Sequence, residues 1–258
     1  MGKMRRAGSM NRSGFSVSVA MAAYNGEPFI ENQIESILSQ LRKGDELVIS
    51  LDPSSDNTEE IIKAFVKRDK RIKWLRGEGK GLVNNFSNAI RHCSNDIVFL
   101  SDQDDLWKKG KVDIVLSYFE DPKINVVMHD AEIVNEKGEQ RFPSFIEKRG
   151  CRTGIFKNIF KNSYIGCCMA FRNSIRKYIF PFPENIPMHD QWIGLVGEIT
   201  GKNVIIDDVL LSYRRHDKNA SEETHSDIRQ MFKWRLEVVG SVVGFAVKYY
   251  LYKGRSQK

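Results

Sequence analysis

Three carboxylates lie within four residues, at Asp102, Asp104 and Asp105, directly after the apolar run Asp96–Leu100. A solvated turn explains one such carboxylate well but three poorly, because neighbouring carboxylates repel one another. A divalent cation that prefers oxygen ligands, such as Mn²⁺ or Mg²⁺, would relieve this repulsion, and such ions commonly bridge carboxylates to a substrate phosphate. The stretch therefore predicts a metal-dependent site for a phosphorylated substrate.

Polar residues that follow two other expected strands could reach the same place. Tyr24 and Asn25 follow a strand expected over Phe15–Ala23, and Asp52 follows one expected over Glu46–Leu51. Tyr24 offers a flat face to a nucleobase, and Asp52 could accept a hydrogen bond from a base N–H. Taken alone, Asp52 is better explained as a turn residue and Tyr24 as an edge-packing residue.

Three further polar stretches carry weaker signals. Asp190 stands at the start of an expected helix, where an aspartate is usually an N-cap. His216 follows Arg214 and Arg215, and a histidine beside two arginines is more often a surface residue than a metal ligand. The glycine-rich segment 77–81 matches neither a dinucleotide-binding fingerprint nor a Walker A loop, so it predicts a flexible loop.

The elements that position these residues alternate between strands and helices. Strands are expected at 15–23, 46–51, 72–75, 96–100 and 124–128, and helices at 28–41, 56–66, 81–93 and 111–119. This alternation predicts βαβ units and a mostly parallel sheet, in which ligands bind beyond the carboxyl ends of the strands. The second half is less regular, with a basic loop at 141–161, strands at 168–171 and 209–214, and helices at 190–200 and 226–252.

The charge is concentrated at the two ends of the chain. The sequence has 258 residues and a formal net charge of +7. Segments 1–14 and 248–258 contain eight basic residues and no acidic one, so the remainder is nearly neutral. Because a nucleic-acid-binding protein needs a basic face on its folded body, we expect no nucleic-acid partner.

Cysteine usage and hydropathy indicate the compartment. Cys93, Cys151, Cys167 and Cys168 show no zinc-site spacing, and we expect them to be reduced thiols. No apolar segment of a secretory signal precedes Phe15, and no apolar run approaches the roughly 20 residues that span a bilayer. We therefore expect a cytoplasmic protein, either free or peripheral on the cytoplasmic face of the inner membrane.

Five segments together resemble glycosyltransferase family 2, of the bacterial polysaccharide and rhamnosyltransferase-like type. The similar segments are 22–40, 52–62, 96–111, 188–194 and 210–221. In the second segment Leu51 replaces the first Asp of the usual Asp-Asp-x-Ser pattern. The resemblance implies an α/β GT-A fold, Rossmann-like and mostly parallel with helices on both faces, plus a C-terminal helical extension.

The resemblance also implies roles for individual residues. Asp102-Gln103-Asp104 would be the DxD motif, with Asp104 the metal ligand and Asp102 near the ribose. Asp190 matches the catalytic base, and His216 matches a histidine that joins the metal and diphosphate. Residues implied to bind the nucleotide sugar are Ala22, Tyr24 (near the base), Asn25, Asp52 (on uracil), Asn85, Asp102, Gln103, Arg214 and Arg215 (toward phosphate).

The implied activity is that of an inverting hexosyltransferase that depends on Mn²⁺ or Mg²⁺. It would move a sugar from a UDP- or dTDP-linked donor to a glycan or lipid-diphosphate-linked acceptor, in synthesis of a bacterial capsule, O-antigen or cell-wall glycan. A phosphohydrolase or nucleotidyltransferase also uses clustered aspartates, but the haloacid-dehalogenase pattern follows the first strand and has Thr or Val where Leu106 stands. A basic-tailed membrane-surface adaptor is the non-enzymatic alternative.

These inferences divide the chain into three parts. Residues 1–14 form a basic N-terminus, and 15–221 the glycosyltransferase domain, with a nucleotide-sugar half (15–130) and an acceptor half (131–221). Residues 222–258 form a helix that anchors on a membrane surface, completes the core or forms a homodimer. The basic segment 141–161 fits a lipid-diphosphate acceptor and is equally well explained as a solvated loop.

Overall fold

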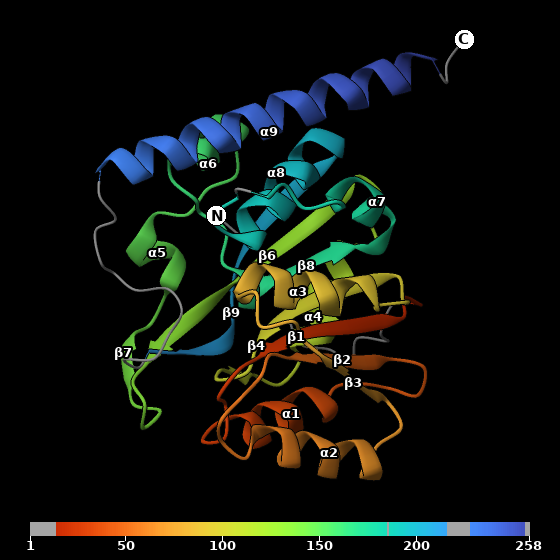
Figure 1. Cartoon of the computed structure of the whole chain (residues 1–258), viewed down its shortest axis with the longest axis vertical. Coiled ribbons are helices and arrows are strands. Elements are labelled where there is room, and N and C mark those ends of the chain that lie inside the picture. The colour runs from red at the N-terminus through yellow and green to blue at the C-terminus, as the bar shows by residue number, and fades with distance from the viewer. Residues whose placement is uncertain (1–13, 185, 216–227, 256–258) are drawn as a thin grey trace.

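The computed structural model describes residues 14–184, 186–215 and 228–255 (Figure 1). In the described residues nine strands form one sheet. Its first half is the parallel set β3-β2-β1-β4, made of β1 (Val17–Ala23), β2 (Glu46–Leu51), β3 (Ile72–Arg76) and β4 (Ile97–Asp102). β1, β2 and β4 are buried along almost their whole length, which is why they are continuous apolar runs in the sequence.

The second half of the sheet mixes strand directions. β8 (Met169–Arg172) pairs antiparallel with both β4 and β6 (Ile124–Val134), and β9 (Lys202–Arg214) runs parallel to β6. Two short strands complete it: β5 (Leu106–Trp107), on the edge of β9, and β7 (Gln140–Phe142), which pairs with β6. The expected mostly parallel α/β fold is confirmed.

Helices cover both faces of the sheet, as expected. Figure 1 shows α3 (Leu82–Arg91) on one side of β1 to β3, and α1 (Ile30–Leu38) and α2 (Thr58–Arg68) on the other. α4 (Lys111–Tyr118) packs on β6, and α8 (His189–Thr200) on β6 and β9. The remaining short elements are α5 (Phe145–Arg149), α6 (Ile155–Phe160), α7 (Arg176–Ile179), η1 (Gly166–Cys168) and η2 (Asn173–Ile175).

β6 and β9 are longer than the sequence indicates. β6 continues six residues past Met128 because tertiary partners bury its polar part. Asp130, for example, is buried and accepts hydrogen bonds from the Ser144 hydroxyl and the Ile146 N–H. The segment 141–161, expected to be a loop, contains the short helices α5 and α6.

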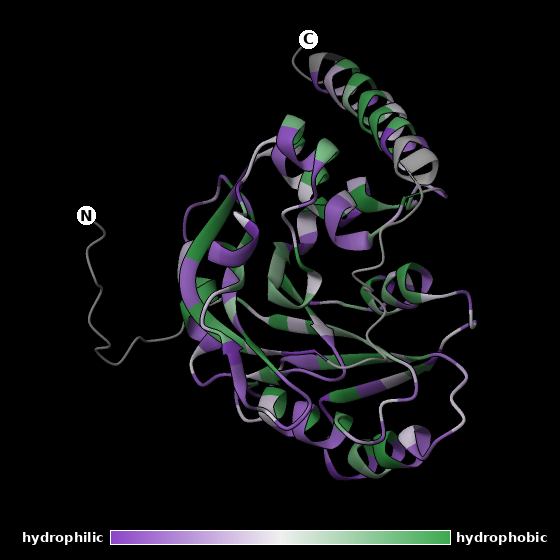
Figure 2. Cartoon of the chain, turned by 90° about the vertical axis from the view of Figure 1, so that its left-hand side faces the viewer, coloured by the Kyte–Doolittle hydropathy of each residue, from purple (hydrophilic) through white to green (hydrophobic). Residues whose placement is uncertain are grey.

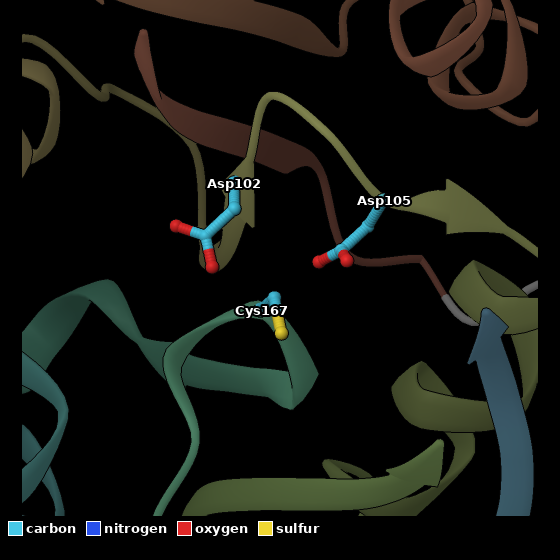
Figure 3. A group of neighbouring side chains, drawn as sticks. All are labelled: Asp102, Asp105 and Cys167. Atoms are coloured by element: carbon cyan, nitrogen blue, oxygen red, sulfur yellow. The ribbon is translucent and has the colours of Figure 1, made fainter. Parts of the chain in front are cut away.

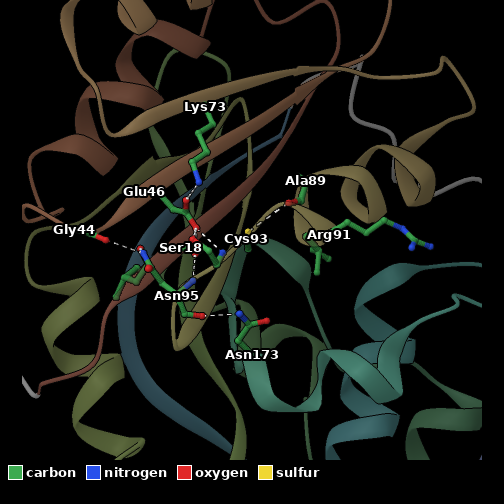
Figure 4. Close-up of polar contacts among 12 residues, drawn as sticks. Ser18, Gly44, Glu46, Lys73, Ala89, Arg91, Cys93, Asn95 and Asn173 are labelled. Carbon is green, nitrogen blue, oxygen red and sulfur yellow. Dashed lines mark hydrogen bonds and ion pairs between the residues drawn. The ribbon is translucent and has the colours of Figure 1, made fainter.

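A polar cluster joins the amino ends of the strands, at the edge opposite to the predicted site (Figure 4). Glu46 is buried there and accepts hydrogen bonds from Ser18 Oγ at 2.5 Å, Ser94 N at 2.6 Å and Ser94 Oγ at 2.9 Å. Lys73 Nζ forms an ion pair with it at 2.5 Å. Although burial by itself raises the pKa of Glu46, these partners lower it overall.

The long C-terminal helix α9 (Ile228–Arg255) packs one face on the body of the protein. Val238 and Val242 are buried, while Phe245 contacts Trp192 of α8 and Tyr178 of α7. Packing against the core is thus observed for one of its faces. No helix in the described part of the chain is long and apolar enough to cross a membrane.

Candidate active site

The carboxyl ends of β1, β2 and β4 meet at one edge of the sheet. Ala22 of β1 pairs in register with Asp102 of β4 and with Ser50 of β2. Tyr24, Asp52 and the acidic stretch therefore leave the sheet side by side. The sequence-based expectation that these segments converge is confirmed.

Gln103 joins two of these segments. Its Oε1 accepts a hydrogen bond from Tyr24 N at 2.8 Å, and its Nε2 donates to Tyr24 O at 2.6 Å. A side chain at Gly26 would collide with this amide, since a Cβ there would lie 2.2 Å from Gln103 Oε1. Gln103 thus positions the backbone of Tyr24, whose side chain is 57% exposed and accessible to a planar ligand.

Asn25 fixes the turn after β1 to the turn after β2. It has a positive φ of 46°, which asparagine tolerates better than most residues. Its N–H donates to Ser54 Oγ at 3.0 Å, and its Oδ1 accepts from Ser55 N at 2.8 Å. The side chain of Asn25 is therefore engaged within the protein.

Asp52 and Asn85 lie against the glycine-rich segment. Asp52 is buried, and its Oδ1 accepts a hydrogen bond from Gly79 N at 3.0 Å. Asn85 Nδ2 donates to Ala23 O at 3.0 Å. A Cβ at Gly77 would lie 2.2 Å from Asp52 Oδ1, so glycine is required there for close approach. Instead of the expected flexible loop, residues 77–79 pack on Asp52.

The acidic stretch contributes to a compact group of potential metal ligands. One ligand atom each of Asp102, Asp105 and Cys167 lies within 4.8 Å of the others. Figure 3 shows Asp102 at the end of β4, Asp105 on the segment that follows it, and the thiol of Cys167 on η1. Asp105 is buried and its Oδ1 accepts from Arg214 N at 3.0 Å, whereas its Oδ2 has no hydrogen-bond partner among the described residues.

The electrostatics of this group favour a cation. Burial, followed by the charges of Asp105 and Asp104, raises the pKa of Asp102. Burial and the charge of Asp104 raise the pKa of Asp105 to about 7. The two carboxylates and the unpaired Oδ2 fit a hard divalent ion such as Mn²⁺ or Mg²⁺. The thiol of Cys167 fits less well, since burial raises its pKa and it stays protonated at neutral pH.

Asp104, the ligand implied by the family resemblance, is not part of this group. It is half-buried next to Asp105, and its backbone carbonyl accepts a hydrogen bond from Arg214 Nε at 2.9 Å. The guanidinium of Arg214 also lies 5.0 Å from the centre of the Phe29 ring. Arg214 thus fixes the acidic segment from the end of β9.

Lys111 is a buried cation that the sequence did not reveal as part of the site. Its Nζ donates to Cys167 O at 2.9 Å and lies 4.0 Å from the centre of the Trp107 ring. Burial lowers the pKa of Lys111 to about 8. Its charge partly offsets those of Asp102 and Asp105. In the sequence it resembles any lysine of an amphipathic helix.

Asp190 lies in the first turn of α8, and the helix begins one residue earlier than predicted. It is therefore not the N-cap, which is Met188. The carboxylate is buried: Oδ1 accepts from Asn162 Nδ2 at 3.0 Å, and Oδ2 from Gly166 N at 3.1 Å. Burial raises its pKa to about 6, and its charge in turn raises the pKa of Asp102.

Two predicted residues follow β9. Arg215 Nη1 donates to Tyr213 Oη at 3.3 Å, and the Arg215 guanidinium lies 5.9 Å from the centre of the Tyr213 ring. His216, the predicted metal and diphosphate ligand, lies outside the described residues.

The sheet, its helices and the carboxylates beyond β4 define the GT-A class of α/β proteins. The sequence profile of Glycosyl transferase family 2 matches residues 18–180, more than half of the chain. The chain belongs to this family and is a glycosyltransferase. Neither the phosphohydrolase or nucleotidyltransferase alternative nor the non-enzymatic adaptor is supported.

A curated relative is similar along almost the whole chain. It is the UDP-Glc:alpha-D-GlcNAc-diphosphoundecaprenol beta-1,3-glucosyltransferase WfgD of Escherichia coli, 26% identical over 233 residues, or 89% of this chain and 87% of that protein. Two glycosyltransferases of Rickettsia species are much longer, and the chain spans 30% of each.

Two solved structures share the fold. Residues 1–349 of Staphylococcus aureus TarS, in complex with UDP-GlcNAc, give a TM-score of 0.70 at 16% identity, over 88% of this chain and 66% of that one. The Pyrobaculum calidifontis mannosyltransferase PcManGT, with GDP-Man and Mn²⁺, gives 0.61 at 14% identity, over 94% and 80%. At these identities the likeness establishes the GT-A fold.

Proposed function

We propose that this glycosyltransferase inverts the anomeric configuration and moves a sugar from a UDP- or dTDP-linked donor to a lipid-linked or glycan hydroxyl in bacterial surface polysaccharide synthesis. The observation that carries the proposal is the setting of Asp190, a buried carboxylate with donors on both oxygens. It stands in a different element from Asp102 and Asp105. A single displacement needs one such base and no covalent nucleophile.

In this mechanism Asp190 removes the proton from the acceptor hydroxyl while the hydroxyl oxygen attacks the anomeric carbon. The bond from that carbon to the diphosphate breaks on the opposite face, and its electron pair leaves with the diphosphate. With a pKa of about 6, Asp190 is mostly ionised at neutral pH and still accepts a proton readily. The hydrogen bonds from Asn162 and Gly166 orient it.

The reaction also requires that the negative charge developing on the departing diphosphate be stabilised. A bound divalent cation supplies charge neutralisation to the departing diphosphate. Its ligands would be Asp102 and Asp105 by geometry, with Asp104 and His216 added by the family resemblance. Lys111 supplies further positive charge near these carboxylates, and the family resemblance adds Arg214 or Arg215 toward the phosphates.

For the donor, we infer a uridine or thymidine nucleotide stacked near Tyr24, with Asp52 on the base. The exposed ring of Tyr24 and the nearby buried Asp52 support this assignment. WfgD is named for UDP-Glc, and TarS was solved with UDP-GlcNAc, whereas the mannosyltransferase was solved with GDP-Man. The identity of the base is therefore part of the test.

For the acceptor, we infer a sugar on a lipid diphosphate at the cytoplasmic face of the inner membrane. WfgD is named for a diphosphoundecaprenol-linked acceptor. The basic segment 141–161 reaches Asp190 through Asn162, which directly follows it. The homodimer, one of the alternatives that the sequence allows, is tested below, and no nucleic-acid partner is proposed.

The test is a donor panel with the purified chain. UDP-, dTDP- and GDP-sugars are supplied with Mn²⁺ and a polyprenyl-diphosphate-linked sugar, and nucleoside diphosphate and glycolipid product are quantified. We expect release from a UDP- or dTDP-sugar that requires the acceptor, and NMR of the product should show inverted configuration. A retained configuration, or release of inorganic phosphate from the donors in place of a nucleoside diphosphate, would overturn the proposal.

A further inference from the structure

Two aromatic side chains on α6 project into solvent. Phe156 is 82% exposed and Phe160 is 64% exposed, and they lie four residues apart, on one side of the helix. Asn158 and Ile159 of the same helix are buried. Among the large apolar side chains of the described residues, Phe156 is the most exposed. Large aromatic side chains so exposed commonly mark a contact surface.

The neighbouring helix α9 adds an apolar face. α6 contacts α9, and Figure 2 shows both at the end of the molecule farthest from α1 and α2. On the face of α9 that turns away from the body, apolar residues recur at helical spacing. Its exposed apolar residues are Leu236, Val239, Val243, Val247, Tyr250 and Leu251. We call these six residues, with Phe156 and Phe160, the outer face.

The charges around the outer face are almost all positive. Among the described side chains of α9 and residues 155–161, six are basic and Glu237 is the only acidic one. The basic residues are Lys157, Lys161, Lys233, Arg235, Lys248 and Lys253. A second copy of the chain would bring two basic faces together, which costs free energy. An anionic lipid surface is complementary to apolar residues flanked by Lys and Arg.

We propose that the outer face docks on an anionic lipid bilayer, with Phe156 and Phe160 inserted at headgroup depth. The value of this contact for catalysis rests on the proposed function. α6 leads directly to Asn162, whose side chain donates to Asp190 at 3.0 Å. Docking therefore places the base close to the plane in which a lipid-diphosphate acceptor lies.

Vesicle flotation tests the docking without donor or acceptor, so its failure is separate from a failure of the proposed function. The full chain is mixed with vesicles of phosphatidylcholine alone or with phosphatidylglycerol, at low and high salt. We expect flotation with the anionic vesicles that falls as salt rises. Absence of flotation with anionic vesicles at low salt would overturn the proposal.

Two double variants locate the surface. One combines Phe156→Ser with Phe160→Ser, and the other combines Val243→Asp with Val247→Asp. Each should weaken binding to the anionic vesicles about tenfold or more, because apolar burial is lost. Phe142→Ser is the matched control, an exposed aromatic on β7, and should float like the wild type. Transfer to a water-soluble acceptor analogue should be the same in all of them, and melting curves establish folding.

The same variants test whether a second copy of the chain, instead of a bilayer, covers the outer face. Sedimentation velocity without lipid should give a monomer for the wild type. A wild-type dimer that the outer-face variants dissociate would show that a second copy covers this face and would overturn lipid docking. Flotation of the Phe156/Phe160 variant at wild-type levels would overturn it as well.

Discussion

The side-chain amide of Asn162 donates to Oδ1 of Asp190 at 3.0 Å, while the N–H of Gly166 donates to Oδ2 at 3.1 Å. Both oxygens of a buried carboxylate are thereby fixed from one segment, between α6 and β8. Two segments of the chain thus hold this carboxylate, which is the base in the proposed mechanism. The profile match to the family ends at residue 180, before Asp190, so this assignment depends on the resemblance of segment 188–194 and on the geometry.

Replacing the base should separate turnover from binding. Asp190→Asn retains the shape of the side chain but cannot accept a proton at neutral pH. We expect kcat to fall by about 10² to 10⁴, with little change in the Kd of the nucleotide sugar. Single-turnover kinetics and calorimetry measure the two quantities. Turnover within a few-fold of the wild type would show that Asp190 has only a structural role.

Removing the amide of Asn162 should move the pH profile. Its hydrogen bond favours the ionised form of Asp190, so Asn162→Ala should raise the pKa of that carboxylate above its present value of about 6. Because the base must be ionised, the acidic limb of kcat against pH should shift to higher pH. Asn84→Ala, on the exposed side of α3, is the control and should leave the profile unchanged. An unshifted profile for Asn162→Ala would contradict the orienting role.

Metal removal should abolish transfer reversibly. We expect EDTA to eliminate product formation, and Mn²⁺ or Mg²⁺ to restore it. Asp105→Asn should raise the Mn²⁺ concentration needed for half-maximal rate by about tenfold or more, because a charged oxygen ligand is lost. Asp113→Asn, which changes a partly exposed carboxylate of α4, serves as the control. Full activity in EDTA would refute the metal requirement.

A side chain at position 77 should disturb the donor site. In Gly77→Ala the added Cβ would lie 2.2 Å from Asp52 Oδ1, so this carboxylate must move. We expect a higher KM for the nucleotide sugar and a loss of stability of about 1–3 kcal/mol from overpacking. Gly240→Ala, whose Cβ meets no atom within 4 Å, should leave KM unchanged. Equal KM values for both variants would argue against donor binding at Asp52.

Glu46 should stabilise the fold in a pH-dependent way. Its partners lower its pKa in the folded state, so its contribution is present above the unfolded pKa and is lost as pH falls through the folded one. Glu46→Gln should cost about 1.5–3 kcal/mol of unfolding free energy at pH 7, with the difference shrinking in acid. Urea unfolding at several pH values measures this. Glu78→Gln, which removes an exposed pair with Lys80, should have little effect.

Much of the nucleotide-binding half is determined by the sequence alone. Buried parallel strands must be apolar on both faces, so β1, β2 and β4 can be predicted from continuous apolar runs in the sequence. Their carboxyl ends must share one edge, which brings Tyr24, Asp52 and Asp102 together without knowledge of the structure. The family can also be identified from the sequence, because several of its motifs lie at these strand ends.

Only the tertiary structure decided how the charges are distributed around the site. Lys111 reads as a surface lysine of an amphipathic helix but is buried against Cys167, from a segment more than fifty residues away. The pairing of Asn162 with Asp190 and the grouping of Asp105 with Cys167 likewise join distant segments. Such contacts carry no local pattern, because a polar residue is buried wherever a distant partner compensates the loss of water.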